Sequence, residues 1–200
     1  MGGVALVAKQ VGDGSISMLA SETVSLALIL LRTLLFTQDT EKAQRATLSF
    51  PQDAIPPLLR LLGARKGSEF GEFAEAASSI AVNIVWVLSA LPRDNRAHQD
   101  ALREAGSIPV LVSLLEGPAK EDLALGAAVV AAIAALVQGN ERNAREMLPA
   151  RAVAPLLQVL LDPSGLGRSL NTRQMAAKAL RALTGLLYSN EQRKMVQGLE

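Results

Sequence analysis

Residues 95–117 read NRAHQDALREAGSIPVLVSLLEG, two short amphipathic runs that meet at Ala-Gly-Ser-Ile-Pro. In the second run, counted from Ile108, apolar residues recur at i, i+3, i+4, i+6 and i+7, which predicts a helix with a wide buried stripe. Pro109 falls in the first turn of that helix, where a missing N–H costs no hydrogen bond. The stretch therefore predicts two successive helices with a junction near Gly106.

The second run recurs in the chain, in three matching blocks: Ile55–Leu62, Ile108–Leu115 and Val153–Leu160. Each block is followed by a break and then by a longer helical run. Similar endings close four such runs, at residues 34–38, 91–95, 136–140 and 186–190. The endings are 57, 45 and 50 residues apart, which is the length expected for three-helix units of a solenoid. The spacing varies mainly in the Gly-, Pro- and Ser-rich breaks at 63–71 and 162–171, which predict surface loops.

The segment REAGSIPVLVSLLEG (103–117) resembles the junction between the first and second helices of an armadillo repeat. Helix order and offsets agree with that family from about residue 24 to residue 196, whereas HEAT repeats lack the short first helix. The resemblance implies an all-α, right-handed armadillo-repeat superhelical solenoid forming a single domain over 1–200. Its expected units are a partial repeat at about 20–40, repeats at about 41–95, 96–140 and 141–190, and the start of a further repeat at 191–200.

The composition excludes several classes of protein. The 200 residues carry a formal net charge of +1, so there is no global basic field for nucleic acid. There is no cysteine, hence neither disulfide nor thiolate chemistry, which fits a cytoplasmic location and is compatible with a nuclear one. Residues 123–140 carry no charge, but the apolar part is short and rich in alanine, so we expect burial between helices and no membrane span.

Nothing in the sequence predicts an enzyme. The single histidine, His98, lies in the polar first helix of the middle repeat, and one histidine without converging partners makes neither a triad nor a metal site. We expect it to be a surface residue. No cofactor and no metal ion are predicted.

In armadillo proteins the third helices line a concave surface, and the resemblance implies binding there through a ladder of Asn side chains, each with a Trp one turn earlier. The four endings place the ladder at Thr33, Ala90, Ala135 and Gly185, and the tryptophan positions at Ile29, Trp86, Ala131 and Arg181. Only Trp86 matches the family pattern. Since no amide stands at the ladder, the family's grip on an extended backbone is not expected here.

These positions instead predict a shallow groove of small residues, with one aromatic and with Lys178 and Arg181 near its end. We expect a protein–protein interaction module of a scaffold or adaptor, which takes a helical or extended partner segment, acidic near the last repeat. Other interpretations stay open. The small residues could serve close packing, Trp86 could be a core residue, the charges could be a solvated face, and the long loops could bind. A chaperone-like domain that clamps a folded partner and shifts its conformational or nucleotide state is the alternative function.

After Asn190 the sequence EQRKMVQ resembles ERNAREM at Glu141–Met147, which predicts another first helix. The next second helix would then begin past Glu200. We therefore expect a piece of a longer repeat protein whose last unit exposes apolar surface around 153–161 and 175–187. Self-association through this uncapped C-terminal end is a further expectation.

Overall fold

The computed structural model of the protein describes residues 18–64 and 74–197, and the side chains of residues 25–62 and 78–185. Most of the loop expected at 63–71 lies outside the described residues. Between these limits the chain forms helices and turns without a strand. The helices are α2 (Met18–Leu35), α3 (Thr40–Leu48), α4 (Ile55–Ala64), α5 (Ala74–Ala90), α6 (Arg96–Glu104), α7 (Ser107–Glu116), α8 (Leu123–Val137), α9 (Glu141–Met147), α10 (Val153–Leu161) and α11 (Leu170–Gln197), with the 3-10 turns η1 (Gln52–Ala54), η3 (Pro118–Lys120) and η4 (Leu166–Arg168).

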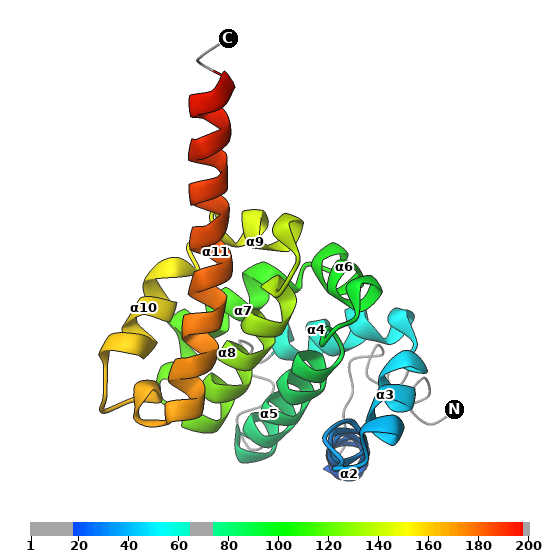
Figure 1. Ribbon diagram of the computed structural model, residues 1–200. Coiled ribbons are helices and arrows are strands. Elements are labelled where there is room, and N and C mark those ends of the chain that lie inside the picture. The colour runs from blue at the N-terminus through cyan, green and yellow to red at the C-terminus, as the bar shows by residue number, and fades with distance from the viewer. Residues whose placement is uncertain (1–17, 65–73, 198–200) are drawn as a thin grey trace.

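The helices repeat in the order short first, medium second and long third. The first helices are α3, α6 and α9, the second are α4, α7 and α10, and the third are α5, α8 and α11, preceded by α2. Each third helix packs on the next, α5 between α2 and α8, and α8 between α5 and α11 (Figure 1). This arrangement confirms the prediction of an all-α, armadillo-type solenoid.

A side-chain cap begins each first helix. Asp39, Asn95 and Asn140 each accept a hydrogen bond from the backbone N–H three residues later, at 3.1, 3.2 and 3.0 Å. This satisfies a backbone donor that the first helical turn leaves without a partner. In the second and third units the residue before the cap has a left-handed backbone, Asp94 at φ 51° and Gly139 at φ 65°, which turns the chain out of the third helix.

The break that the sequence predicts after Asn190 is absent, because α11 continues without interruption to Gln197. The residues expected to start a further first helix are therefore the last turns of a third helix. At the corresponding position Ser189 replaces Asp94 and Gly139. Serine enters the left-handed region less readily than glycine, aspartate or asparagine, which favours continuation of the helix at this position.

The core runs through the whole stack and centres on α8. Twelve of the 15 residues of α8 are buried, and the helix lies between α5 and α11. The uncharged segment noted in the sequence is therefore covered by neighbouring helices. Among the described helices none is long and apolar enough to cross a membrane.

The last unit exposes apolar surface on its second helix. Leu157 and Leu161 of α10 are exposed, Leu161 at 79%. Leu157 corresponds to Val112 of α7, which is buried in the stack. On α11, by contrast, the exposed residues from 171 to 185 are polar, charged or small. The apolar surface expected around 153–161 is present, whereas that expected around 175–187 is not seen up to Gly185, and side chains beyond it lie outside the described part.

Candidate functional site

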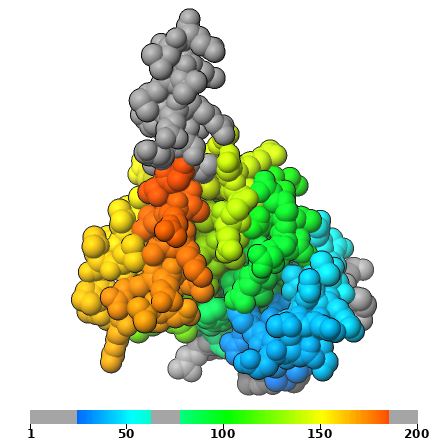
Figure 2. Space-filling view, in the orientation of Figure 1, coloured from blue at the N-terminus to red at the C-terminus, as the bar shows by residue number. Residues whose placement is uncertain are grey.

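The third helices bring the nine predicted groove positions onto neighbouring helices, but with unequal exposure. Ile29 and Thr33 on α2 and Lys178, Arg181 and Gly185 on α11 are exposed. Trp86 on α5 is half-buried, while Ala90, Ala131 and Ala135 are buried. The middle of the predicted groove is thus a closed floor, and the accessible side chains lie toward its two ends. Figure 2, in the orientation of Figure 1, shows the units in chain order from blue to orange with their side chains in contact.

Trp86 is held by an aromatic pair. Its ring lies edge-to-face with that of Phe36, with centroids 5.5 Å apart and an interplanar angle of 88°. The guanidinium of Arg93 lies over the other ring, 4.4 Å from the centroid of Phe36. Partial burial lowers the pKa of Arg93 below its ordinary value, and the Asp94 carboxylate opposes this. The cluster fixes the indole while leaving part of it accessible. Sequence analysis did not single out Phe36, although it stands in the first of the four endings.

Alanine is the only residue type that α8 presents along this face. Ala124, Ala127, Ala131 and Ala135 lie three or four residues apart, and their exposure falls from exposed to buried toward the C-terminal end of the helix. The neighbouring helix α11 carries the exposed Arg181 at the position that matches Ala131, and the exposed Lys178 one turn earlier at the position that matches Ala128. Neither cation forms an ion pair with any residue whose side chain the structure describes. We call the surface from Trp86 across these alanines to Arg181 the alanine face.

A buried polar network joins the second and third units. Gln99 of α6 donates to the carbonyls of Ala135 and Gln138 at the end of α8, both at 3.0 Å. Asn140 donates to the side-chain oxygen of Gln99 at 3.1 Å, and Asn143 donates to the carbonyls of Gln99 and Leu136 at 3.1 and 3.0 Å. These bonds satisfy most of the buried polar groups at this junction, although the side-chain oxygen of Asn143 is buried without a partner among the described residues. The network holds α8 and α9 on α6, and so sets the position of the alanine face.

His98 does not lie on the surface, so that prediction is wrong. The side chain is buried, its Nε2 lies 3.4 Å from the carbonyl oxygen of Phe50, and its ring meets that of Phe50 edge-on. Its position in the first helix corresponds to that of Asn143, so both residues bond between units. The polar composition of the helix suggested that His98 is exposed. Local composition does not report that the preceding unit packs against this helix.

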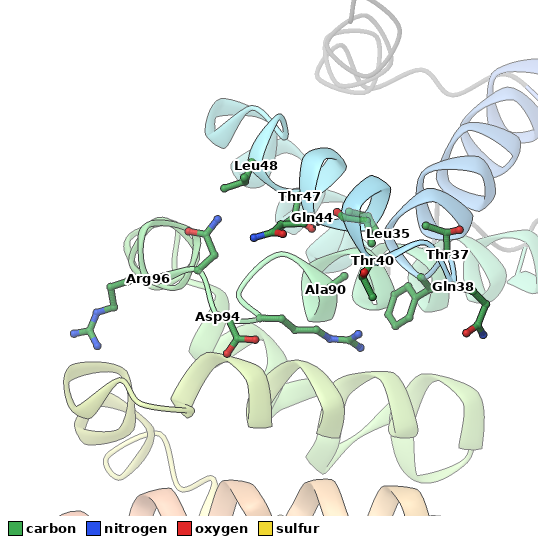
Figure 3. Close-up of a pocket in the computed structure, with 14 residues that line it drawn as sticks. Leu35, Thr37, Gln38, Thr40, Gln44, Thr47, Leu48, Ala90, Asp94 and Arg96 are labelled. Carbon is green, nitrogen blue, oxygen red and sulfur yellow. Dashed lines mark hydrogen bonds between the residues drawn. The ribbon is translucent and has the colours of Figure 1, made fainter.

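Between α3 and α6 the stack opens into a cleft of about 740 Å³ (Figure 3). One wall is the face of α3 that carries Thr40, Ala43, Gln44, Thr47 and Leu48. The other wall is the turn from α5 to α6, which includes Ala90 and residues 93–96. The sequence patterns described above do not predict this cleft.

The long break after α10 lines a second, more apolar cleft of about 610 Å³. Its walls come from the ends of α7 and α10 and from residues 162–166. Elsewhere in the described ranges, 18–64 and 74–197, no three His, Cys, Asp or Glu residues come together as a metal site would require.

Comparison with known proteins supports the fold. No family model and no curated protein matches the sequence. A designed armadillo repeat protein in complex with the peptide (KR)4 is similar in structure, with a TM-score of 0.50 and 23% identity over 78% of this chain. The chain spans 63% of the length of that protein, which is less than two thirds.

Two further solved structures agree. A second designed armadillo repeat protein has a TM-score of 0.51 and 20% identity, covering 90% of this chain and 81% of its own. An engineered protein has a TM-score of 0.54 and 19% identity, covering 92% and 80%. At these identities the likeness bears on the fold and not on what is bound. With the helix order and the stacking described above, the chain has the armadillo-type helical repeat fold.

Proposed function

We propose that the chain is a protein-interaction module that binds a segment of another protein on the alanine face. The observation that carries this proposal is the composition of that face. A floor of alanines on α8 lies between a half-buried indole on α5 and two cations on α11 that have no described acidic partner. Such a surface offers apolar contact and positive charge to a partner. No described catalytic group lies beside it.

The partner segment that this face fits best is an amphipathic helix. Alanines allow a helix to approach closely, an indole supplies a flat apolar contact, and acidic side chains on the partner would pair with Lys178 and Arg181. An extended segment held by its backbone fits less well. The ladder positions Thr33, Ala90, Ala135 and Gly185 offer no amide side chain that could bond both N–H and C=O of a passing strand.

The name of one structural neighbour supports a polypeptide partner, since that designed protein is in complex with the peptide (KR)4. For this chain we propose the opposite charge preference. Cations at 178 and 181 would repel a basic segment, so (KR)4 should bind more weakly than an acidic amphipathic helix of the same length, as fluorescence anisotropy can measure.

Replacement of Trp86 by Ala together with Arg181 by Glu should weaken binding of a partner protein at least tenfold. The change removes the aromatic contact and reverses one charge, each worth roughly 1 kcal/mol or more in a desolvated contact. A partner recovered by affinity capture, then purified and titrated by calorimetry, gives the measurement. The matched control is Leu157→Ala with Arg60→Glu, which makes similar changes at exposed positions of the second helices.

Circular dichroism must first show that the double variant keeps its helix content. If its affinity then equals that of the unchanged protein, the alanine face is not the binding surface. The cleft lined by residues 162–166 would then be the next site to test, because binding residues often lie on loops held by a rigid scaffold.

Self-association is a second interaction that the exposed leucines of α10 support. Leu157 corresponds to Val112 of α7, which is buried in the stack, so a second copy could cover it, whereas Leu161 corresponds to the exposed Glu116. The exposed residues of α11 from 171 to 185 are polar, charged or small, so the apolar area available for this contact is limited. We therefore propose weak association, seen in light scattering as a mass that rises with concentration and reduced by Leu157→Glu. A constant monomer mass at millimolar concentration would exclude it.

A further inference from the structure

The cleft between α3 and α6 exists because three side chains of α3 are short. Asp39, Asn95 and Asn140 cap the three first helices in the same way, so the helices can be compared position by position. By this comparison Thr40, Ala43 and Thr47 of α3 correspond to Arg96, Gln99 and Arg103 of α6. In the same way Ala90 and Arg93, at the end of α5, correspond to Ala135 and Gln138 at the end of α8.

At the junction of the second and third units, the three long side chains fill the space between first helices. Gln99 donates to the carbonyls of Ala135 and Gln138, both at 3.0 Å. Arg96 donates to the carbonyl of Gly139 at 3.0 Å, and Arg103 pairs with Glu146 at 3.4 Å. A carboxamide therefore occupies the centre of this junction, with the two guanidinium groups beside it.

At the preceding junction the shorter side chains do not reach across. No hydrogen bond joins α3 to the end of α5 or to α6, segments whose side chains the structure describes at every residue concerned. The space remains as the cleft of about 740 Å³, large enough for a few residues of a polypeptide (Figure 3). Ala43, the counterpart of Gln99, and Ala90, the counterpart of Ala135, both line it.

The groups that form hydrogen bonds with the Gln99 side chain, at the junction of the second and third units, have counterparts in this cleft. By alignment, the carbonyls of Ala90 and Arg93 correspond to the two acceptors of its amide N–H groups, and the carbonyl of Ala90 also accepts the backbone N–H of Arg93 at 3.3 Å. Asn140 donates to the side-chain oxygen of Gln99, and the counterpart of Asn140 is Asn95. Asn95 lines the cleft, and its Nδ2 bonds no described residue. Two acceptors and one donor at these matched positions complement a carboxamide, which is both donor and acceptor.

The rim of the cleft is apolar where a polypeptide would leave it. Leu48 is 66% exposed and Phe36 also reaches the surface. We propose that the cleft binds a short segment of a partner polypeptide, and that a Gln side chain of this segment takes the position that Gln99 holds at the next junction. This site lies between first helices. Phe36 at its rim packs on Trp86 of the alanine face, but the residues that would hold the Gln side chain lie on α3 and in the turn from α5 to α6.

The probe for this proposal is the acetylated and amidated peptide Ala-Ala-Gln-Ala-Ala, titrated into the protein labelled with ¹⁵N. Changes in amide chemical shift are expected for residues 40–48 and 93–96 and should saturate. The same peptide with Leu in place of Gln should bind about tenfold more weakly, because the polar groups of the cleft would then be desolvated without partners.

The variant Ala43→Gln supplies the missing side chain from within the chain. It should raise Tm by about 2–4 °C, the shift that one added hydrogen bond gives in a chain of this size, and it should weaken binding of the Gln peptide at least fivefold. Thr40→Arg fills the cleft from a neighbouring position and should weaken binding as well. Arg181→Glu, on the alanine face, should leave it unchanged.

Several results would overturn the proposal. They are absence of any shift change at millimolar Gln peptide, equal binding of the Gln and Leu peptides, and undiminished binding to folded Ala43→Gln and Thr40→Arg. A shift change confined to α8 and α11 would assign the peptide to the alanine face and exclude the cleft, so that this outcome leaves the proposed function standing.

Discussion

Replacement of Gly167 by alanine is expected to lower the free energy of unfolding by about 2–3 kcal/mol, in the range found for overpacked cores. Gly167 lies in η4, the turn that connects α10 to α11, and it is buried. A Cβ atom there would fall on the carbonyl oxygens of Val159 and Asp162. Both are backbone atoms, so relief requires η4 to move away from α10.

That movement is itself restricted by α8. Leu166, the neighbour of Gly167, packs on Gly126, where a Cβ would overlap the leucine side chain and would lie 2.7 Å from the carbonyl oxygen of Ala119. The turn is therefore held between two helices, and it cannot readily move to relieve a clash at position 167. Urea unfolding followed by circular dichroism at 222 nm measures the change.

Gly185→Ala serves as the matched control. Gly185 lies inside α11, and among the described residues a Cβ there would meet no heavy atom within 4 Å outside the backbone of its own helix. Alanine should stabilise the helix by about 0.5–1 kcal/mol, since glycine is the poorer helix former. Equal effects of the two substitutions, or a loss below about 0.5 kcal/mol for Gly167→Ala, would contradict the packing described for η4.

Replacement of Asn143 by leucine is expected to cost about 2–3 kcal/mol. The side chain is completely buried, and its amide group donates to the carbonyls of Gln99 and Leu136. Leucine has a similar size, so the cost comes mainly from carbonyl groups left in the interior without these donors. The same unfolding experiment gives the value, and loss of the link between α6 and α9 should also speed amide hydrogen exchange in α9.

Arg145→Leu provides the comparison on the same helix. Arg145 is half exposed and pairs with Glu141 one turn earlier, an arrangement that contributes about 0.5 kcal/mol or less. If both variants lose the same small amount of stability, the buried network does not hold the units together. An account based on apolar packing alone would then suffice.

The order and type of the helices could be predicted from the sequence because they depend on local patterns. The apolar spacing in Ile55–Leu62, Ile108–Leu115 and Val153–Leu160 reports helices that bury one side, and the caps and turns between them are local as well. The continuous α11 could not be predicted from the similarity of the endings alone. At α5 and α8 a residue with a left-handed backbone, Asp94 or Gly139, precedes the next cap, and Ser189 stands at the corresponding position of α11.

The candidate sites depend on contacts between units, which local patterns do not report. His98 was placed on the surface because its helix is polar, yet it bonds a residue of the preceding unit. The open cleft follows from the lengths of side chains at matched positions, such as Ala43 against Gln99. Alignment of the first helices by their caps would have shown this difference in side-chain length. That the difference leaves a polar site open follows only from the carbonyl groups at the ends of α5 and α8, which the sequence does not place.

The central claim is that a partner protein binds on the alanine face of the third helices. The most direct test places a photo-reactive benzoylphenylalanine at Ala124 on α8, or at Arg60 on α4 as the comparison, in the presence of the partner recovered by affinity capture. Both positions are exposed, and Ala124 carries no charge that the partner would need. The account predicts cross-linking from position 124, suppressed by Trp86→Ala, and none from position 60. Cross-linking from position 60 without any from position 124 would contradict it.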